Sequence, residues 1–410
     1  MDSTKTAIKS LVLDLRKSLE ADIEVGLRRY GITPTTLRPL DTLKHLNDRE
    51  LSARIRMEET IRHEIGRDEA TDDLADAVYW FVREVAFTHL NRLVGLKALE
   101  VRGLAPESIQ TRSEYGDRSR ALRDYRAEHA EAAALPDDGL ELALQQVCRQ
   151  IYPEFRLLFD VGDPAEMRDA PVNSLLWPST PTLKACIANI NELDEKIERS
   201  GPPAHEKATP EQSVWAEDEI IGWIYQFYNA EEKVSIRKKG KPKHPAEVAV
   251  INQFFTPRWI VKFLVDNTLG RLWLEMHPDS PRVRERCDYL VPEPLAGTEK
   301  SQTDGQIQLD PESPINHAYA EPRRAAKRPQ EIRLIDPACG TMHFGHYAFE
   351  VFQSIYADAR EQGWMGSSDA LSDDQVPAAI LENNLFGVDI DLRAVQLAAL
   401  SLFMKAKSAN

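Results

Sequence analysis

Residues 332–341 read IRLIDPACGT, and this stretch decides the fold class of the C-terminal part of the chain. Four residues suited to a strand (IRLI) lead into a turn, and an apolar helical pattern through Phe349, Phe352 and Tyr356 follows it. A second short strand, Leu385–Val388, comes later and leads into Asp389. A strand, a turn, a helix and a further strand in this order predict the opening of a parallel α/β sheet.

The turn itself is a candidate ligand site. In α/β sheets, ligands bind above the carboxyl ends of the strands and against helix N-termini. Gly340 would let the backbone approach a ligand closely, and Asp336 would offer a carboxylate to an ammonium or hydroxyl group. The sequence GxxxxGK[ST] is absent, which argues against phosphate transfer from a nucleoside triphosphate. Taken alone, a turn capped by its aspartate explains the pattern equally well.

Asp389 and Asp391 follow the second strand. An acidic residue at the end of such a strand commonly binds the hydroxyls of a ribose, which makes Asp389 a candidate. It lies farther from Asp336 than the about 20 residues that are usual, and the polar segment 358–377 can absorb the excess as an inserted loop. For Asp391 we prefer a simple role as the cap of the following helix.

Residues 1–212 are predicted to form a helical domain. The strongest helix is expected over Leu74–Val101, because apolar residues recur there at three- and four-residue steps and Gly103 suits its C-terminal end. The polar stretch 198–212 carries consecutive prolines and is expected to be a surface linker.

Three further segments follow the linker. Residues 213–290 are predicted to be helical, with helices over Trp215–Asn229 and Trp259–Glu275. Residues 291–330 are rich in Pro, Glu, Gln, Ser and Asp, which predicts a mobile loop. The predicted α/β part then occupies residues 331–410.

Composition excludes several classes of protein. A chain of 410 residues with 42% hydrophobic and 29% charged residues is typical of a globular protein with more than one domain. No apolar run reaches the length of a membrane span, and the N-terminus has no signal-peptide pattern. The four cysteines lie far apart, which fits the reducing cytoplasm. Because the net charge is −15, any contact with nucleic acid is expected from a local basic patch.

Two weaker patterns lie between the helical domain and the turn. Phe255-Thr256-Pro257 precedes a predicted helix, where Thr256 suits the N-cap and Pro257 the first turn. A basic run without an intervening acid is a candidate for contact with nucleic-acid phosphates, although charge runs are more often solvated loops. The run consists of Arg237, Lys238, Lys239, Lys241 and Lys243.

Together, FTP, then DPACGT, then Gly387-Val388-Asp389 resemble the motifs of the adenine-specific DNA methyltransferases, in the order that places FTP first. The resemblance extends to the PglX family of the BREX phage-defence systems. It rests there on AFTHLNRLVGLKALEV (86–101), EIIGWIYQFYN (219–229) and NQFFTPRWIVKFLVDNTLGRLWLE (252–275). One departure is Met342, which stands where the family's loop has a second glycine.

The resemblance implies a fold and an activity. The fold would be a mainly α N-terminal half followed by the start of an α/β Rossmann-like S-adenosylmethionine-dependent methyltransferase domain, incomplete in this chain. The activity would be transfer of a methyl group from S-adenosylmethionine to N6 of an adenine flipped out of double-stranded DNA, in phage defence or restriction-modification. Other defence proteins would be possible partners. The residues implied at the cofactor are Phe255, Thr256, Pro257, Asp336, Ala338, Gly340, Thr341, Asp389 and Ile390.

The catalytic motif of that family, Asn-Pro-Pro followed by an aromatic residue, is absent. Gly201-Pro202-Pro203 lacks both the Asn and the aromatic residue. We therefore assign no catalytic residue, and we expect this chain to be the N-terminal portion of a longer enzyme that does not methylate alone. Cys339 follows Ala338, whereas the nucleophile of cytosine methyltransferases follows a proline, so a packing role is preferred. No metal site is expected.

Two alternatives remain open. The chain can be a non-catalytic helical module of a defence complex that binds cofactor or partner proteins. Methylation of a protein glutamine uses the same catalytic motif, and the large helical N-terminal half disfavours it.

Overall fold

The computed structural model describes residues 3–65, 74–151, 155–162, 170–200, 213–242, 245–291, 324–365 and 371–409. It is 68% helix with few short strands, in agreement with the predicted α-rich N-terminal half. Contacts divide the chain into two compact units, the first made of residues 1–254 with 391–404 and the second of residues 255–390 with 405–410. The boundaries predicted at residues 212, 290 and 330 stay predictions, because segments 201–212 and 292–323 lie outside the described residues.

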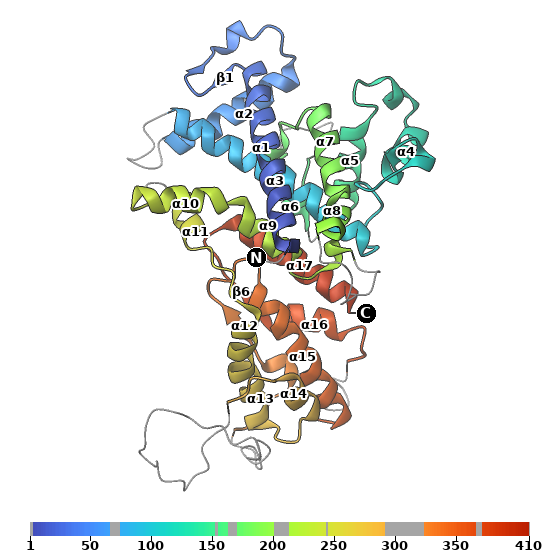
Figure 1. The fold of residues 1–410 in the computed structure, drawn as a ribbon, viewed down its shortest axis with the longest axis vertical. Coiled ribbons are helices and arrows are strands. Elements are labelled where there is room, and N and C mark those ends of the chain that lie inside the picture. The colour runs from blue at the N-terminus through green and yellow to red at the C-terminus, as the bar shows by residue number, and fades with distance from the viewer. Residues whose placement is uncertain are drawn as a thin grey trace. The chain divides into compact units, whose positions relative to one another are not determined.

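The first unit is built almost entirely of helices (Figure 1). Two short antiparallel hairpins, β1–β2 and β3–β4, accompany them. The elements in chain order are α1 (Ser3–Arg29), β1 (Ile32–Thr33), β2 (Thr36–Leu37), α2 (Asp48–Ile65), α3 (Leu74–Val101), β3 (Thr111–Arg112), β4 (Arg118–Ser119), α4 (Arg120–Glu128), α5 (Leu140–Gln150), α6 (Arg156–Phe159), α7 (Thr180–Asn191), α8 (Leu193–Ser200), α9 (Ile220–Tyr228), α10 (Ala230–Lys239), α11 (Pro245–Ile251) and most of α17 (Leu392–Ser408).

Helix α3 is the centre of the first unit. Its bounds are those predicted, and Gly103 follows it in a left-handed conformation with φ 69°. Helices α1 and α2 pack on α3 (Figure 1). Helix α17 approaches α3 at Gly95, where an added Cβ would lie 3.1 Å from Leu400. Several helices therefore pack on the wide apolar surface of α3, which explains why α3 is buried on nearly all sides.

Buried polar side chains of α3 hold the loops around it. Arg92 is 2% exposed and donates through Nε to the carbonyl of Leu158 at 2.8 Å. The carboxylate of Glu100 accepts the backbone N–H groups of Ser108 and Ile109 at 2.8 and 2.9 Å. Each of these groups exchanges water for a partner in the protein, so the polar residues of the segment 86–101 specify loop conformation.

The second unit contains the parallel pair β5 (Leu334–Asp336) and β6 (Leu385–Gly387). Asp336 lies opposite Gly387 in the pair. Helices α15 (His343–Glu361) and α16 (Val376–Asn383) connect the two strands. The other elements of the unit are α12 (Arg258–Val265), α13 (Arg271–Met276) and α14 (Pro281–Arg286).

Asn384 fixes where the parallel pair begins. It is fully buried, and its amide nitrogen donates to the carbonyls of Pro329 and Ile332, both at 2.7 Å. Its amide oxygen accepts the hydroxyl of Tyr356 on α15 at 2.9 Å. One side chain thus joins the residue before β6 to the segment before β5 and to the intervening helix.

The helix predicted over Trp259–Glu275 is interrupted. Helix α12 ends at Val265, and a π-helical turn, Asp266–Gly270, separates it from α13. Asp266 at the start of this turn is fully buried, and its Oδ1 accepts the hydroxyl of Tyr347 at 2.8 Å. Burial raises the pKa of Asp266. The π-helical turn coincides with this buried contact to α15. The spacing of apolar residues in the sequence does not predict such a contact, so it predicted one continuous helix.

No helix among the described residues combines the length and the apolar character needed to cross a membrane.

Candidate functional site

Two of the predicted motifs meet at the carboxyl ends of β5 and β6. The backbone N–H of Gly340 donates to Oδ2 of Asp389 at 2.8 Å, and the N–H of Cys339 donates to the carbonyl of Val388 at 3.0 Å. Within the turn, Ala338 donates its N–H to Oδ1 of Asp336 at 3.1 Å. The predicted ribose acid therefore lies directly beside the glycine turn, although the two are 49 residues apart in the chain.

Gly340 leaves open space at the turn. Its φ is +52°, and an added Cβ would meet nothing within 4 Å. Asp336 and Asp389 are half-buried, whereas Ile390 is 79% exposed. Thr341 is buried, and Ala338 is exposed. The turn thus presents backbone, two carboxylates and one apolar side chain at the ends of the strands.

Met342 takes the place of a glycine by turning its side chain inward. Its φ is +66°, the left-handed conformation that glycine adopts most readily. The side chain is 2% exposed. An added Cβ on Gly345 would lie 2.4 Å from Met342 Cγ, and one on Gly387 would lie 3.0 Å from its Sδ. Two glycines elsewhere therefore make room for the methionine, and it fills the space beneath the turn.

The FTP segment lies against the same turn. The ring of Phe255 is 4.3 Å from the imidazole of His343, the first residue of α15. The expected cap differs from the observed one: α12 begins at Arg258 with Pro257 as its N-cap, and no side chain caps it. Thr256 is half-buried and Pro257 is exposed. The predicted motifs thus gather at the start of α15.

His343 was not among the residues predicted at the site. Its position directly after the DPACGT turn was the feature of the sequence that could have indicated contact with another motif. The contact with Phe255 gives it a packing role at the site.

Cys339 is a packing residue. It is 6% exposed, and burial, together with the charges of Asp389 and Asp336, raises the pKa of its thiol to about 11. A thiol with so high a pKa is a poor nucleophile at neutral pH.

Helix α9 and the residue that caps its C-terminus make hydrogen bonds to two residues of the first unit that are close to the motifs in sequence. The hydroxyl of Tyr225 donates to Oδ2 of Asp391 at 2.8 Å, and Asn229 donates from its amide to Gln253 at 3.4 Å. Asp391 also accepts the N–H of Arg393 at 3.0 Å, so its predicted role as a helix cap is confirmed. Gln253 comes just before Phe255, and Asp391 just after Ile390. Tyr225 lies in the segment 219–229 that carries the resemblance, but no local pattern singles out its hydroxyl.

The predicted DNA contact is exposed. Arg237, Lys238 and Lys239 form the last turn of α10, and Lys241 follows Gly240; all are exposed. Lys243 lies outside the described residues. Glu232, in the first turn of α10, forms ion pairs with Arg16 and Arg83.

Comparison with known proteins gives a consistent result. The adenine-specific methyltransferase PglX of Lacticaseibacillus casei (strain Zhang) is 27% identical over an alignment of 427 positions. The alignment covers 99% of this chain and 33% of that protein. The adenine-specific methyltransferase BrxX of Escherichia coli O9:H4 (strain HS) is 30% identical over 345 residues, covering 80% of this chain and 24% of that protein. The chain is PglX-like. No family model matches it.

The PglX-like similarity extends over nearly the whole chain, so it includes the helical unit as well as the motifs. The chain spans about a third of PglX and about a quarter of BrxX.

Proposed function

We propose that this PglX-like chain carries the cofactor-binding motifs of a DNA adenine-N6 methyltransferase of a BREX-type phage-defence system, with S-adenosylmethionine as the methyl donor. The observation that carries the proposal is the hydrogen bond from Gly340 N to the Asp389 carboxylate, with Phe255 packed on His343 beside it. The names of the two relatives support the adenine-specific activity.

The residues at the turn fit that cofactor. The open space at Gly340 admits a ligand close to the backbone, and the carboxylate of Asp389 suits the hydroxyls of a ribose. The exposed side chain of Ile390 offers an apolar surface to the flat face of a base. S-adenosylmethionine supplies an electrophilic methyl group on a sulfonium ion.

The residues of this chain would bind and orient rather than transfer protons. Asp389 receives the Gly340 N–H, so the acid and the turn keep a common geometry. Phe255 is held on His343, which places the FTP segment over the start of α15. Positioning of this kind contributes most of the catalysis when no general base is needed.

The chemistry on the adenine would need groups beyond these residues. The 410 residues contain no Asn-Pro-Pro-aromatic sequence. We therefore assign this chain cofactor binding and expect no methyl transfer by it alone. Double-stranded DNA would contact the exposed basic residues at the end of α10, where the negative end of the helix dipole also favours cations. Other defence proteins are proposed partners, and the cytoplasm is the proposed location.

The test is a calorimetric titration of S-adenosylmethionine into the 410-residue chain and three variants. Asp389→Ala removes the carboxylate, and Asp389→Asn keeps an acceptor for Gly340 N while removing the charge. Asp374→Ala is the matched control, because Asp374 is an exposed aspartate of the same unit outside the motifs. Circular dichroism shows whether each variant is folded.

We expect saturable binding by the unaltered chain and by the control. Loss of a hydrogen bond to a charged group costs about 1.5–3 kcal/mol, so Asp389→Ala should weaken binding about 10- to 150-fold. The affinity of Asp389→Asn should lie between that of the unaltered chain and that of Asp389→Ala. Equal affinity in all four proteins, or no binding by the folded unaltered chain, would contradict the proposal.

A further inference from the structure

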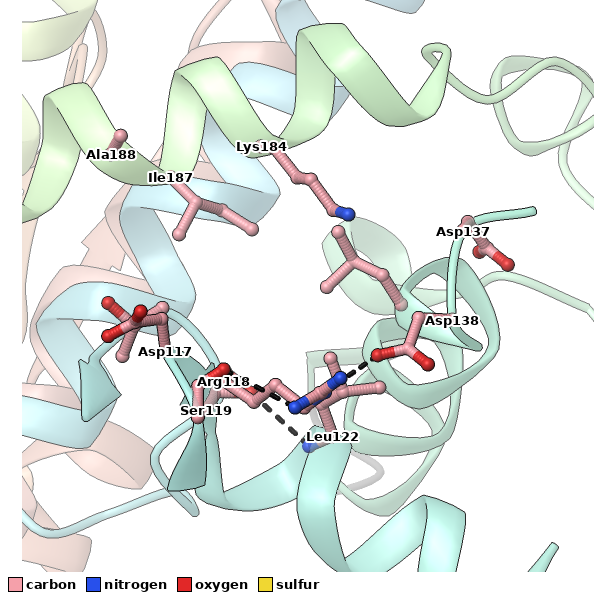
Figure 2. Close-up of a pocket in the computed structure, with 13 residues that line it drawn as sticks. Asp117, Arg118, Ser119, Leu122, Asp137, Asp138, Lys184, Ile187 and Ala188 are labelled. Atoms are coloured by element: carbon pink, nitrogen blue, oxygen red, sulfur yellow. Dashed lines mark hydrogen bonds and ion pairs between the residues drawn. The ribbon is translucent and has the colours of Figure 1, made fainter. Parts of the chain in front are cut away.

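The helical unit contains a cavity that the proposed function does not use. It has a volume of about 380 Å³ and lies between α7, the β3–β4 hairpin with the start of α4, and the turn before α5 (Figure 2). All the residues that line it are described, and all belong to the first unit. Its volume is within the range of pockets that bind small molecules.

The walls of the cavity are partly apolar. Leu122 of α4, Leu140 of α5 and Ile187 of α7 line it, and each is about 5% exposed. Their positions are fixed by packing within the unit, so they present a preformed surface to an apolar group.

The carboxylates at the cavity are already engaged or turned aside. Asp138 accepts hydrogen bonds from Arg118 and Arg126, both at 2.6 Å. Asp137 accepts the backbone N–H groups that begin α5, among them that of Gly139 at 3.1 Å. The carboxylate of Asp117 lies on the side of the hollow away from Lys184 (Figure 2).

Lys184 is the cation that remains. Its side chain extends from α7 over the cavity (Figure 2). Among the described residues its ammonium group makes no direct hydrogen bond or ion pair, and its charge acts on Asp138 from a longer distance. Arg118 and Arg126 both pair with the carboxylate of Asp138. The ammonium group of Lys184 can therefore pair with the anionic head of a ligand.

Ser108 adds a buried donor to the cavity wall. The residue is 2% exposed, and its hydroxyl has no partner among the described residues. Its backbone N–H is held by Glu100 at 2.8 Å, so the residue cannot easily turn away. A buried hydroxyl without a partner costs free energy, and a ligand oxygen at this point would remove that cost.

We propose that this cavity binds a small organic anion, in which a carboxylate or phosphate head pairs with Lys184 and a compact apolar body lies on Leu122, Leu140 and Ile187. The cavity would serve as an effector or recognition site in the helical unit. It is independent of the cofactor proposal, because none of its residues belongs to the cofactor motifs.

Phenyl phosphate and 3-phenylpropionate are the probes for the two possible heads, and 3-phenylpropanol is the uncharged control. Each is titrated into the 410-residue chain by calorimetry. Lys184→Ala removes the charge, and Ala188→Trp fills the cavity from an exposed position on α7. Ala185→Trp is the matched control, since Ala185 is exposed on the same helix and does not line the cavity.

We expect saturable binding of at least one anion, and the stronger probe identifies the head. Lys184→Ala removes a charged hydrogen-bond donor, so the affinity for the anion should fall about tenfold or more. Ala188→Trp should abolish binding and Ala185→Trp should leave it unchanged. The proposal is overturned if neither anion binds saturably, if the uncharged alcohol binds as tightly, or if both Trp variants behave alike.

Discussion

Replacement of Met342 by glycine tests how the turn is built. In the structure the methionine side chain is 2% exposed and packs where Gly345 and Gly387 lack side chains. Met342→Gly should therefore destabilise the second unit without changing access to the turn.

The magnitude follows from two opposing effects. Truncation of a buried methionine to a small residue costs about 2–5 kcal/mol, because packing is lost and a cavity remains. Relief of the left-handed conformation, at φ +66°, returns about 1–2 kcal/mol. We expect a net loss of about 2 kcal/mol in the free energy of unfolding, the difference between the middle values of the two effects, measured by guanidinium denaturation.

Gly345→Ala provides a partner for a double-mutant cycle. In the unaltered chain the new Cβ would lie 2.4 Å from Met342 Cγ, so this change should destabilise. With glycine at position 342 the clash is absent and the alanine should recover about 0.5–1 kcal/mol as a better helix former. A coupling free energy of about 1 kcal/mol or more is expected between the two sites.

Two results would refute this reasoning. Additive effects of the two changes would mean that Met342 does not pack on Gly345. A gain of more than about tenfold in affinity for S-adenosylmethionine on Met342→Gly, equivalent to about 1.4 kcal/mol, would mean that the methionine occupies cofactor space. We expect an affinity within about threefold of the original.

Further predictions concern pH and DNA. Burial, with a contribution from Asp137, raises the pKa of Glu141 from 4.5 to about 7. Between these values the folded state keeps a proton that the unfolded state releases, so stability should fall by up to about 3 kcal/mol as pH rises from 4.5 to 7. Denaturant unfolding at pH 5 and 8 should show this loss, and Glu141→Gln should abolish it; an equal loss in the variant contradicts the assignment. Replacement of Lys238, Lys239 and Lys241 by alanine should weaken DNA binding and flatten the slope of log K against log salt concentration by about 2–3. An unchanged slope in filter binding would leave these residues as a solvated surface.

Local patterns were sufficient for several elements. The helix Leu74–Val101 was predicted to its bounds, because a long apolar periodicity and Gly103 both act within a few residues of the chain. The strand before the turn was predicted over residues 332–335 and is observed over Leu334–Asp336. Its exact register depends on pairing with β6, which no local pattern contains.

The assembly of the site required the fold. Phe255 meets His343, and Gly340 meets Asp389, through contacts between residues far apart in the chain. The sequence could order these motifs and assign them a chemistry, but it could not determine that they converge at the start of α15.

Sequence by itself therefore determined the helical character of the first unit, the strand–turn–helix order of the second and the PglX-like resemblance. Only the tertiary structure decided how Met342 is accommodated and where α12 is interrupted at Asp266. The physical reason is that backbone propensity and apolar periodicity act over neighbouring residues. The conformation of Met342 and the buried bond from Tyr347 to Asp266 depend on which distant side chains, or missing side chains, fill the same space.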